Sequence, residues 1–250
     1  MPAVTLGAVI AVMVAGCASN PAGAPVPSAS GADSYADAVS APPGAVSGSG
    51  PTEFPGGDFP IPADARSVVI DFSCEGDGMF SLELGDSMML GQAPLGGTCG
   101  EPAALSWPIT ERTGPTLYVG IADGVDWVAT PTFSTEEFAT DAAVAADCTA
   151  FIDVYSALAN ADTGYSSYGA FGEDEWNDRV DRAAAALETL AATSQSALAD
   201  SFTGLHQVVV DPARTVGAVL SPVADEWIAP IHRACNANQT PLVIRAEFGG

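Results

Sequence analysis

The side chains that most often carry enzyme chemistry are scarce in this chain of 250 residues. All seven basic residues are arginine, so lysine is absent, and His206 and His232 are the two histidines. Mechanisms that need an ε-amine are therefore excluded, among them nucleotide-binding phosphate loops and Schiff-base enzymes. We expect both histidines near helix C-termini, where the helix dipole favours the protonated ring. No serine has the sequence context of an activated nucleophile, so we predict no catalytic residue.

Acidic residues are the abundant titratable type. The chain has 31 Asp and Glu against 7 basic residues, which gives a formal net charge of −24. A field of this sign repels phosphate backbones, so the sequence disfavours nucleic acid as a partner. The densest acidic group begins at Glu173, but it lacks the alternating ligands and glycine of a calcium loop and fits a solvated helix start. We therefore predict no metal and no cofactor. A pair of carboxylates spaced for glycoside hydrolysis stays open, because sequence does not show their separation.

A stretch of mostly small residues, 164–170, and the helix after it hold the candidate ligand-binding side chains. Aromatic rings flanked by glycine bind sugars or apolar peptides by stacking, at little cost in conformational entropy. The alternative is that the same rings cap the end of a helical bundle. The sequence leaves both open, and the candidate residues are Tyr165, Tyr168, Phe171 and Trp176.

The first 17 residues have the pattern of an export signal. The apolar run from Val4 to Val14 is too short to span a bilayer, and small residues close it, as in signal peptides. Its end, Val14-Ala15-Gly16-Cys17, resembles the lipobox of bacterial prolipoproteins. The resemblance implies that residues 1–16 are removed and that the Cys17 thiol carries a diacylglyceryl group. The protein would then be held on the extracytoplasmic face of the cell membrane by this lipid anchor. The alternative is an ordinary secretory signal cut near Ala18.

The other four cysteines fall in an oxidising compartment if the chain is exported, so we expect two disulfides. Of the three possible pairings we favour Cys74 with Cys99 and Cys148 with Cys235, because each pair then lies within one compositional segment. A structural zinc site needs clustered ligands, and no two cysteines are close in sequence.

Composition and periodicity divide the rest of the chain into three parts. Residues 17–60 contain the lipidated cysteine and then mostly Pro, Gly, Ala and Ser, which predicts a disordered tether. In residues 61–134 apolar side chains alternate, as at Val68, Ile70 and Phe72, and turn signals separate the runs. This pattern predicts a small antiparallel β-sandwich stapled by the first disulfide.

Residues 135–250 change to the helical period. Four apolar stripes predict four helices, the first from about Asp147 and the last carrying Val223, Trp227, Ile231 and Cys235 on its inward face. Cys148 and Cys235 would then meet at one end of a four-helix-type bundle. Asp211-Pro212 and Ser221-Pro222 are helix-start signals, so a short helix is expected to connect the third stripe to the last.

The final segment alternates again at Leu242, Ile244, Ala246 and Phe248, which predicts a C-terminal strand that pairs with the β-domain. The expected class is therefore α+β. The order of tether, β-module, cysteine-framed helices and strand also resembles uncharacterised actinobacterial surface lipoproteins, a likeness that implies no functional residues. The function expected is a lipid-anchored envelope protein with a non-enzymatic binding or structural role toward a cell-wall glycan or protein ligand. The alternative is a cell-wall carbohydrate hydrolase that uses acidic residues.

Overall fold

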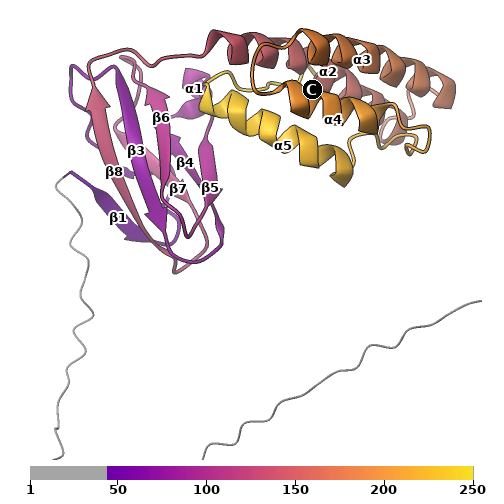
Figure 1. Ribbon diagram of the computed structural model, residues 1–250. Coiled ribbons are helices and arrows are strands. Elements are labelled where there is room, and N and C mark those ends of the chain that lie inside the picture. The colour runs from indigo at the N-terminus through magenta and orange to yellow at the C-terminus, as the bar shows by residue number, and fades with distance from the viewer. Residues whose placement is uncertain (1–43, 250) are drawn as a thin grey trace, which may run out of the picture. The chain divides into compact units, whose positions relative to one another are not determined.

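The computed structural model describes residues 44–249, so the predicted signal peptide 1–16 and the lipidation site Cys17 lie outside the described residues. The described part is a mixed α and β structure with two antiparallel sheets of four strands, five helices and two disulfides. The strands come first along the chain and the four long helices follow (Figure 1). The expected α+β class is confirmed at this level.

In both sheets most neighbouring strands are distant in sequence. In the first sheet the spatial order is β1 (Val46–Ser49), β8 (Asp126–Ser134), β3 (Ser67–Cys74) and β6 (Ala103–Pro108). In the second it is β2 (Gly57–Asp58), β7 (Thr116–Gly120), β4 (Met79–Leu84) and β5 (Leu95–Thr98). A single-turn helix, α1 (Ser87–Leu90), connects β4 to β5.

Alternating side chains of the two sheets form one shared hydrophobic core. Ile70 and Phe72 of β3 are fully buried, whereas Asp71 between them is exposed, as the period of two requires. Phe80 of β4 follows the same pattern, and its ring centroid lies 4.5 Å from that of Phe72. The predicted strand periodicity is therefore confirmed for the central strands.

The predicted tether, 17–60, is too long, because residues 46–58 already contribute β1 and β2 to the sheet edges. These short strands pair through their backbones with β8 and β7, and among their side chains Val46 packs against the core. Gly48 allows the indole of Trp127 to approach closely, since a Cβ there would lie 2.6 Å from the ring. The indole N–H in turn donates to the carbonyl of Gly50 over 2.9 Å. Composition rich in Gly and Pro suits such an edge, where few side chains need burial.

The four long helices follow the predicted order. They are α2 (Ala142–Ser166), α3 (Glu173–Thr193), α4 (Ala199–Val209) and α5 (Pro222–Ala237). α2 begins five residues before the expected Asp147, because the carboxylate of Asp141 caps it by accepting the N–H groups of Ala143 and Val144. α5 begins at the predicted Ser221-Pro222 signal. The inward faces of all four helices share a second core.

Among the residues that the structure describes, α2 is the one helix long and apolar enough to cross a membrane by length and composition. It packs against α3 and α5, and Phe151 and Leu158 on its inward face are fully buried. Its high hydropathy is therefore that of a core helix.

The short helix predicted between the third and fourth long helices is absent, and residues 210–221 form turns instead. The carboxylate of Asp162 on α2 accepts the N–H groups of Val219 and Leu220 over 3.1 and 2.9 Å. Gly217 takes a left-handed conformation with φ of 79°. The signal at Asp211-Pro212 starts a turn and not a helix, because Asp211 accepts the N–H of Ala213 on its carboxylate and that of Arg214 on its carbonyl.

The predicted C-terminal strand is also wrong, since residues 241–249 contain no strand. This segment lies along α2, where the side-chain amide of Asn160 donates to the carbonyl of Arg245 and accepts the N–H of Glu247, each over 2.8 Å. The Ser156 hydroxyl accepts the N–H of Arg245 over 3.0 Å. An amide side chain offers the same donor and acceptor as a peptide group. Asn160 on α2 therefore supplies the hydrogen bonds that a neighbouring β-strand was expected to supply.

The helical part meets the β-strands through α5 and the residue Gln239 that follows it. Gln239, which follows α5, accepts the N–H of Ala93 over 3.3 Å and donates to the carbonyl of Ser106 over 3.4 Å. The contact to the strands therefore comes from α5 and from this amide side chain, and not from a paired strand.

Replacing Asn160 by alanine should detach the C-terminal segment. The variant loses two hydrogen bonds to the backbone of Arg245 and Glu247, so we expect unfolding free energy to fall by about 1–2 kcal/mol and amide exchange at Glu247 to accelerate. Arg245→Ala is the matched control, because its exposed ion pair with Asp153 contributes below about 1 kcal/mol. Equal losses in the two variants would contradict the role of Asn160. Chemical denaturation and hydrogen exchange measure both.

Candidate functional site

The four aromatic residues predicted as a ligand site do not form one surface. Trp176 is fully buried in α3, and its indole N–H donates to the carboxylate of Asp162 over 3.0 Å. The ring is therefore part of the helical core and does not face a ligand. Trp176 was assigned to the site because it follows the aromatic loop in sequence. In the structure it lies in the first turn of α3, on the face that packs into the helical core.

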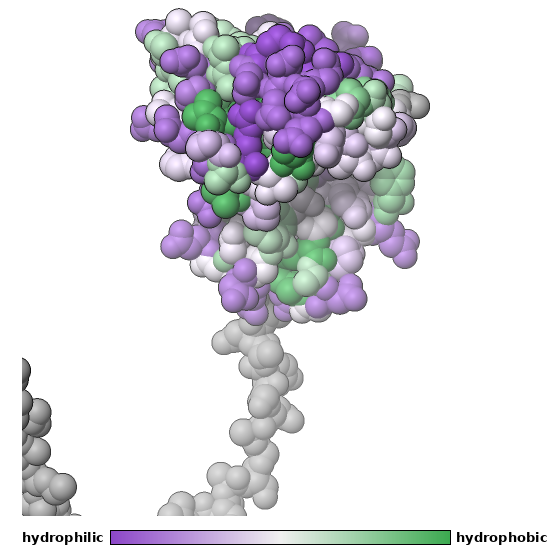
Figure 2. All heavy atoms as spheres, turned by 90° about the vertical axis from the view of Figure 1, so that its right-hand side faces the viewer, coloured by the Kyte–Doolittle hydropathy of each residue, from purple (hydrophilic) through white to green (hydrophobic). Residues whose placement is uncertain are grey.

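Two of the other rings, Tyr168 and Phe171, lie where the C-terminal segment ends. The ring of Phe248 lies 5.6 Å from that of Tyr168 and 6.1 Å from that of Phe171, measured between centroids. The guanidinium of Arg179 stands 4.5 Å above the Phe171 ring. Tyr165 packs against the helical core, and Tyr168 alone keeps more than half of its surface exposed, at 56 %. In the surface view of Figure 2 hydrophobic residues form separate small patches among hydrophilic ones. Phe248 thus occupies the surface predicted for a ligand.

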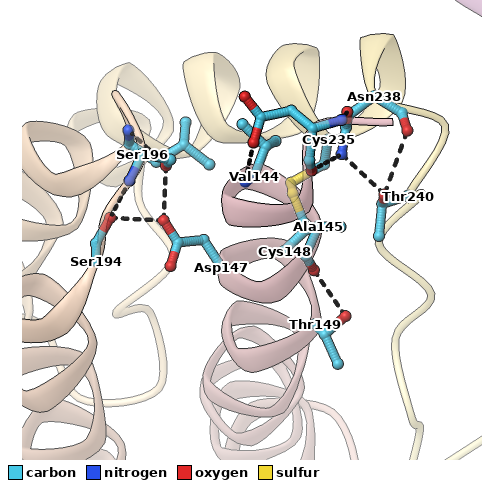
Figure 3. The surroundings of a disulfide bond; sticks show 12 residues. Val144, Ala145, Asp147, Cys148, Thr149, Ser194, Ser196, Cys235, Asn238 and Thr240 are labelled. Carbon is cyan, nitrogen blue, oxygen red and sulfur yellow. Dashed lines mark hydrogen bonds between the residues drawn. A yellow bond between two sulfur atoms is a disulfide. The ribbon is translucent and has the colours of Figure 1, made fainter. Parts of the chain in front are cut away.

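Both predicted disulfide pairings are confirmed. Cys74 at the end of β3 bonds to Cys99, which follows β5, and Cys148 of α2 bonds to Cys235 of α5. The second bond is buried in the helical core, with its cysteines 1 % and 0 % exposed (Figure 3). It ties the start of α2 to the end of α5, as the helix order predicted.

A buried carboxylate lies beside the second disulfide. Asp147 accepts the hydroxyls of Ser194 and Ser196 over 2.5 and 2.6 Å, as Figure 3 shows. Ser196 also accepts the N–H of Leu198, so these bonds fix the connection between α3 and α4. Two hydroxyl donors satisfy the carboxylate, which makes its burial tolerable. Asp147 is therefore a residue that positions the connection between the helices.

His232 is not the protonated surface histidine expected from its place near the end of α5. Its ring meets the edge of Tyr155 at 5.3 Å between centroids, and its Nε2 is buried without a hydrogen-bond partner in the described part of the chain. Burial lowers the pKa of His232 below its usual 6.5, and the nearby carboxylate of Asp225 opposes the shift. Burial also raises the pKa of Tyr155, and Asp225 adds to that effect. His206 does lie in the last turn of α4, as expected.

The acidic group at the start of α3 behaves as a solvated helix start. Glu173, Asp174 and Glu175 occupy the first turn, and Glu175 pairs with Arg179 one turn later over 2.9 Å. Within residues 44–249, no three His, Cys, Asp or Glu side chains come together in a way that could hold a metal ion.

Two grooves run along the helices. The first, of about 620 Å³, lies between α2 and α3, and alanines such as Ala150 and Ala186 line it. Its two carboxylates, Asp153 and Glu247, are ion-paired with Arg245 and Arg179 respectively. These carboxylates are thus engaged by cations on the edge of the groove.

The second groove, of about 590 Å³, lies between α4 and α5. It is lined by Trp227 and Val223 of α5, by Gly204 and Gln207 of α4, and by Asp211 in the connection. Trp227 and Val223 are 37 % and 56 % exposed, which corrects their predicted place on the inward face of α5.

The residues of α5 that face the core form a different stripe, Ala224, Ile228, Ile231 and Cys235, which are 0–4 % exposed. Both stripes have helical spacing, and their shared members Ile231 and Cys235 made the wrong one plausible. An acidic neighbour did not separate the two stripes, because Trp227 follows Glu226 and is exposed, whereas Trp176 follows Glu175 and is fully buried.

Comparison with protein-family models, with curated proteins and with solved structures found no match to this chain. Function is therefore inferred from the sequence pattern and from the geometry of the described residues.

The burial of His232 should make stability depend on pH. Because its pKa is lower in the folded than in the unfolded chain, the unfolded chain binds more protons below about pH 6.5. The contribution of His232 is therefore complete at higher pH and is lost as pH falls through the unfolded-state pKa toward the folded-state value. We expect thermal melts of His232→Leu between pH 7 and 5 to decline less than those of the wild type. Val210→Ala, an exposed change that removes no titratable group, is the control and should keep the wild-type slope; identical slopes for His232→Leu and wild type would refute the assignment.

The two disulfides should differ in their contribution to stability. Cys148 and Cys235 are 87 residues apart and Cys74 and Cys99 are 25 apart. In the chain-entropy model their removal costs about 4.5 and about 3.5 kcal/mol. Buried cysteines at the α2–α5 bond add a packing loss, so Cys148→Ser/Cys235→Ser should be the less stable double variant in denaturant titrations. A larger loss for Cys74→Ser/Cys99→Ser would contradict this order.

Proposed function

We propose that this protein is lipid-anchored on the extracytoplasmic face of a bacterial cell membrane and that its folded part binds a ligand there without transforming it. The motif Val14-Ala15-Gly16-Cys17 supports the anchor, since it resembles the site at which prolipoproteins are cleaved and acylated. The proposal also takes the two sheets as a β-sandwich and the four long helices as a four-helix bundle.

The observation that carries export is the pair of disulfides. One lies in the strand region and the other in the helical core, so both folded parts use a cystine. Disulfides persist in extracytoplasmic compartments and are rare where glutathione and thioredoxin keep thiols reduced. The anchor and the disulfides therefore support the same location by independent chemistry.

The charge of the chain supports attachment through lipid alone. A formal net charge of −24 opposes adsorption to anionic head groups, and all seven cationic side chains are arginines spread along the chain. The same charge disfavours nucleic acid as a partner. A covalent acyl group does not depend on surface charge, and two or more chains give stable anchoring.

Binding is favoured over hydrolysis by the side chains that line the grooves. Glycoside hydrolysis needs one carboxyl group to protonate the leaving oxygen and a second to act as nucleophile or base. In the α2–α3 groove Asp153 and Glu247 are already paired with arginines. The α4–α5 groove instead presents a partly exposed tryptophan with polar neighbours, an arrangement that serves ligand binding.

Replacing Cys17 by alanine tests the anchor. In a bacterial host the wild-type protein should partition into the detergent phase, and its N-terminal peptide should carry the mass of a diacylglyceryl group and incorporate labelled palmitate. The Cys17→Ala variant should be found in the aqueous phase without label. Cys74→Ser/Cys99→Ser is the control and should stay in the detergent phase, because it removes two other cysteines. Membrane retention of Cys17→Ala, or a wild-type protein that begins after Ala18, would refute lipidation.

A further inference from the structure

Trp227 differs from the other tryptophans of the chain in its exposure. The sequence contains four, and Trp107, Trp127 and Trp176 are between 0 and 7 % exposed, whereas Trp227 is 37 % exposed. A large ring left partly in water forgoes the free energy that full burial would supply. Val223, one turn earlier on α5, is 56 % exposed and lines the same groove. The two side chains form an apolar floor that the fold leaves open.

The ring is held in one orientation by Gly204 of α4. A Cβ on Gly204 would lie 2.3, 2.4 and 2.5 Å from three atoms of the indole, so the ring lies flat against the helix backbone. Only glycine permits this approach. A face of the indole is thus covered and its position is set before a ligand arrives, which lowers the entropic cost of stacking a ligand on the exposed part.

The rest of the groove presents hydrogen-bonding groups around this floor. The amide of Gln207, the carboxylate of Asp211 and the hydroxyls of Thr215 and Ser221 line it. Gln207, Asp211 and Thr215 are exposed residues. Donors and acceptors at the edge of an aromatic ring match a pyranose, which has one face of C–H groups and a rim of hydroxyls.

The charges near the groove select against an anionic ligand. Its one cation, Arg214, already donates to the carbonyl of Val209, to Asn177 and to the carboxylate of Asp181. Asp211 lines the groove, and Asp225 and Glu226 precede Trp227 on α5. An anion would meet carboxylates without a free counter-charge, whereas a neutral sugar needs only hydrogen bonds.

We propose that the α4–α5 groove is a glycan-binding site in which Trp227 stacks on the ring of a neutral sugar. The site rests on the proposed function, because it names the class of ligand that the anchored protein binds. The groove of about 590 Å³ falls within the roughly 300–1,000 Å³ of small-molecule sites and has room for a short oligosaccharide. Gln207, Asp211 and Thr215 hydrogen-bond the hydroxyls, and Gly204 keeps the indole in place.

Tryptophan fluorescence tests the proposal on the detergent-purified full-length protein. The probes are neutral trisaccharides (chitotriose, cellotriose, xylotriose, mannotriose and maltotriose), an anionic trigalacturonate and an apolar peptide. Because the other three tryptophans are buried, acrylamide quenching and emission shifts report on Trp227. We expect at least one neutral trisaccharide to shift the emission to the blue and to protect Trp227 from acrylamide. Trigalacturonate and the peptide should do neither.

Variants show whether the groove itself is responsible. Isothermal titration with the binding trisaccharide should give an affinity about tenfold or more weaker for Trp227→Ala, the loss typical of an aromatic anchor. Gly204→Ala, which displaces the ring, should weaken binding as well. Tyr168→Ala, which removes another exposed aromatic ring away from the groove, should bind as the wild type does. Trp227→Ala is informative even if Gly204→Ala does not fold, since its side chain is already partly exposed.

Several outcomes would overturn the site. These are no binding of any neutral trisaccharide to the wild type, unchanged affinity in Trp227→Ala, or preferential binding of trigalacturonate or of the apolar peptide. The anchor is judged separately: loss of glycan binding in Trp227→Ala with unchanged detergent partition would leave the anchor intact. Retention of Cys17→Ala on membranes would remove the anchor without affecting the titration.

Discussion

The helical part of this protein depends on polar side chains that α2 holds at its packed faces. Asp147 binds the connection between α3 and α4, and Asp162 binds the backbone of the turn before α5. Ser156 and Asn160 bind the C-terminal segment. Buried polar groups are costly unless they are hydrogen-bonded, and irregular backbone needs partners that a helix cannot supply for it. Each group on α2 therefore stabilises a segment that would otherwise lack a partner.

This arrangement also determines the walls of the α4–α5 groove. Asp162 fixes Val219 and Leu220 and at the same time accepts the indole N–H of Trp176. The guanidinium of Arg214 lies 5.4 Å from the Trp176 ring and bonds to Val209 at the end of α4. The turn that borders the groove is thus attached to α2, α3 and α4. A groove whose walls are fixed in this way needs little ordering when a ligand binds.

The strands of the two sheets were predicted correctly wherever apolar and polar side chains alternate along the chain. Ile70, Phe72 and Phe80 alternate with polar residues, so a period of two was sufficient to find the central strands. β1 and β2 were missed because backbone pairing holds them at the edges and Val46 is the one apolar side chain that they bring to the core. The reason for a glycine at position 48 is visible only in the structure, where the ring of Trp127 lies against its backbone. Composition alone could not separate this edge from a tether.

Periodicity and composition predicted the structural class and the order of the four long helices, and they favoured the pairing of Cys74 with Cys99 and of Cys148 with Cys235 that the structure contains. These features follow from periodicity and from positions along one segment, which are local properties. Tertiary structure alone decided which aromatic rings are buried, because Trp176 and Trp227 have similar helical surroundings in sequence and opposite exposure in the fold. The binding of the C-terminal segment by Asn160 was also visible only in the structure. A side-chain amide can bond to the backbone of a distant segment only when the fold brings that segment beside it.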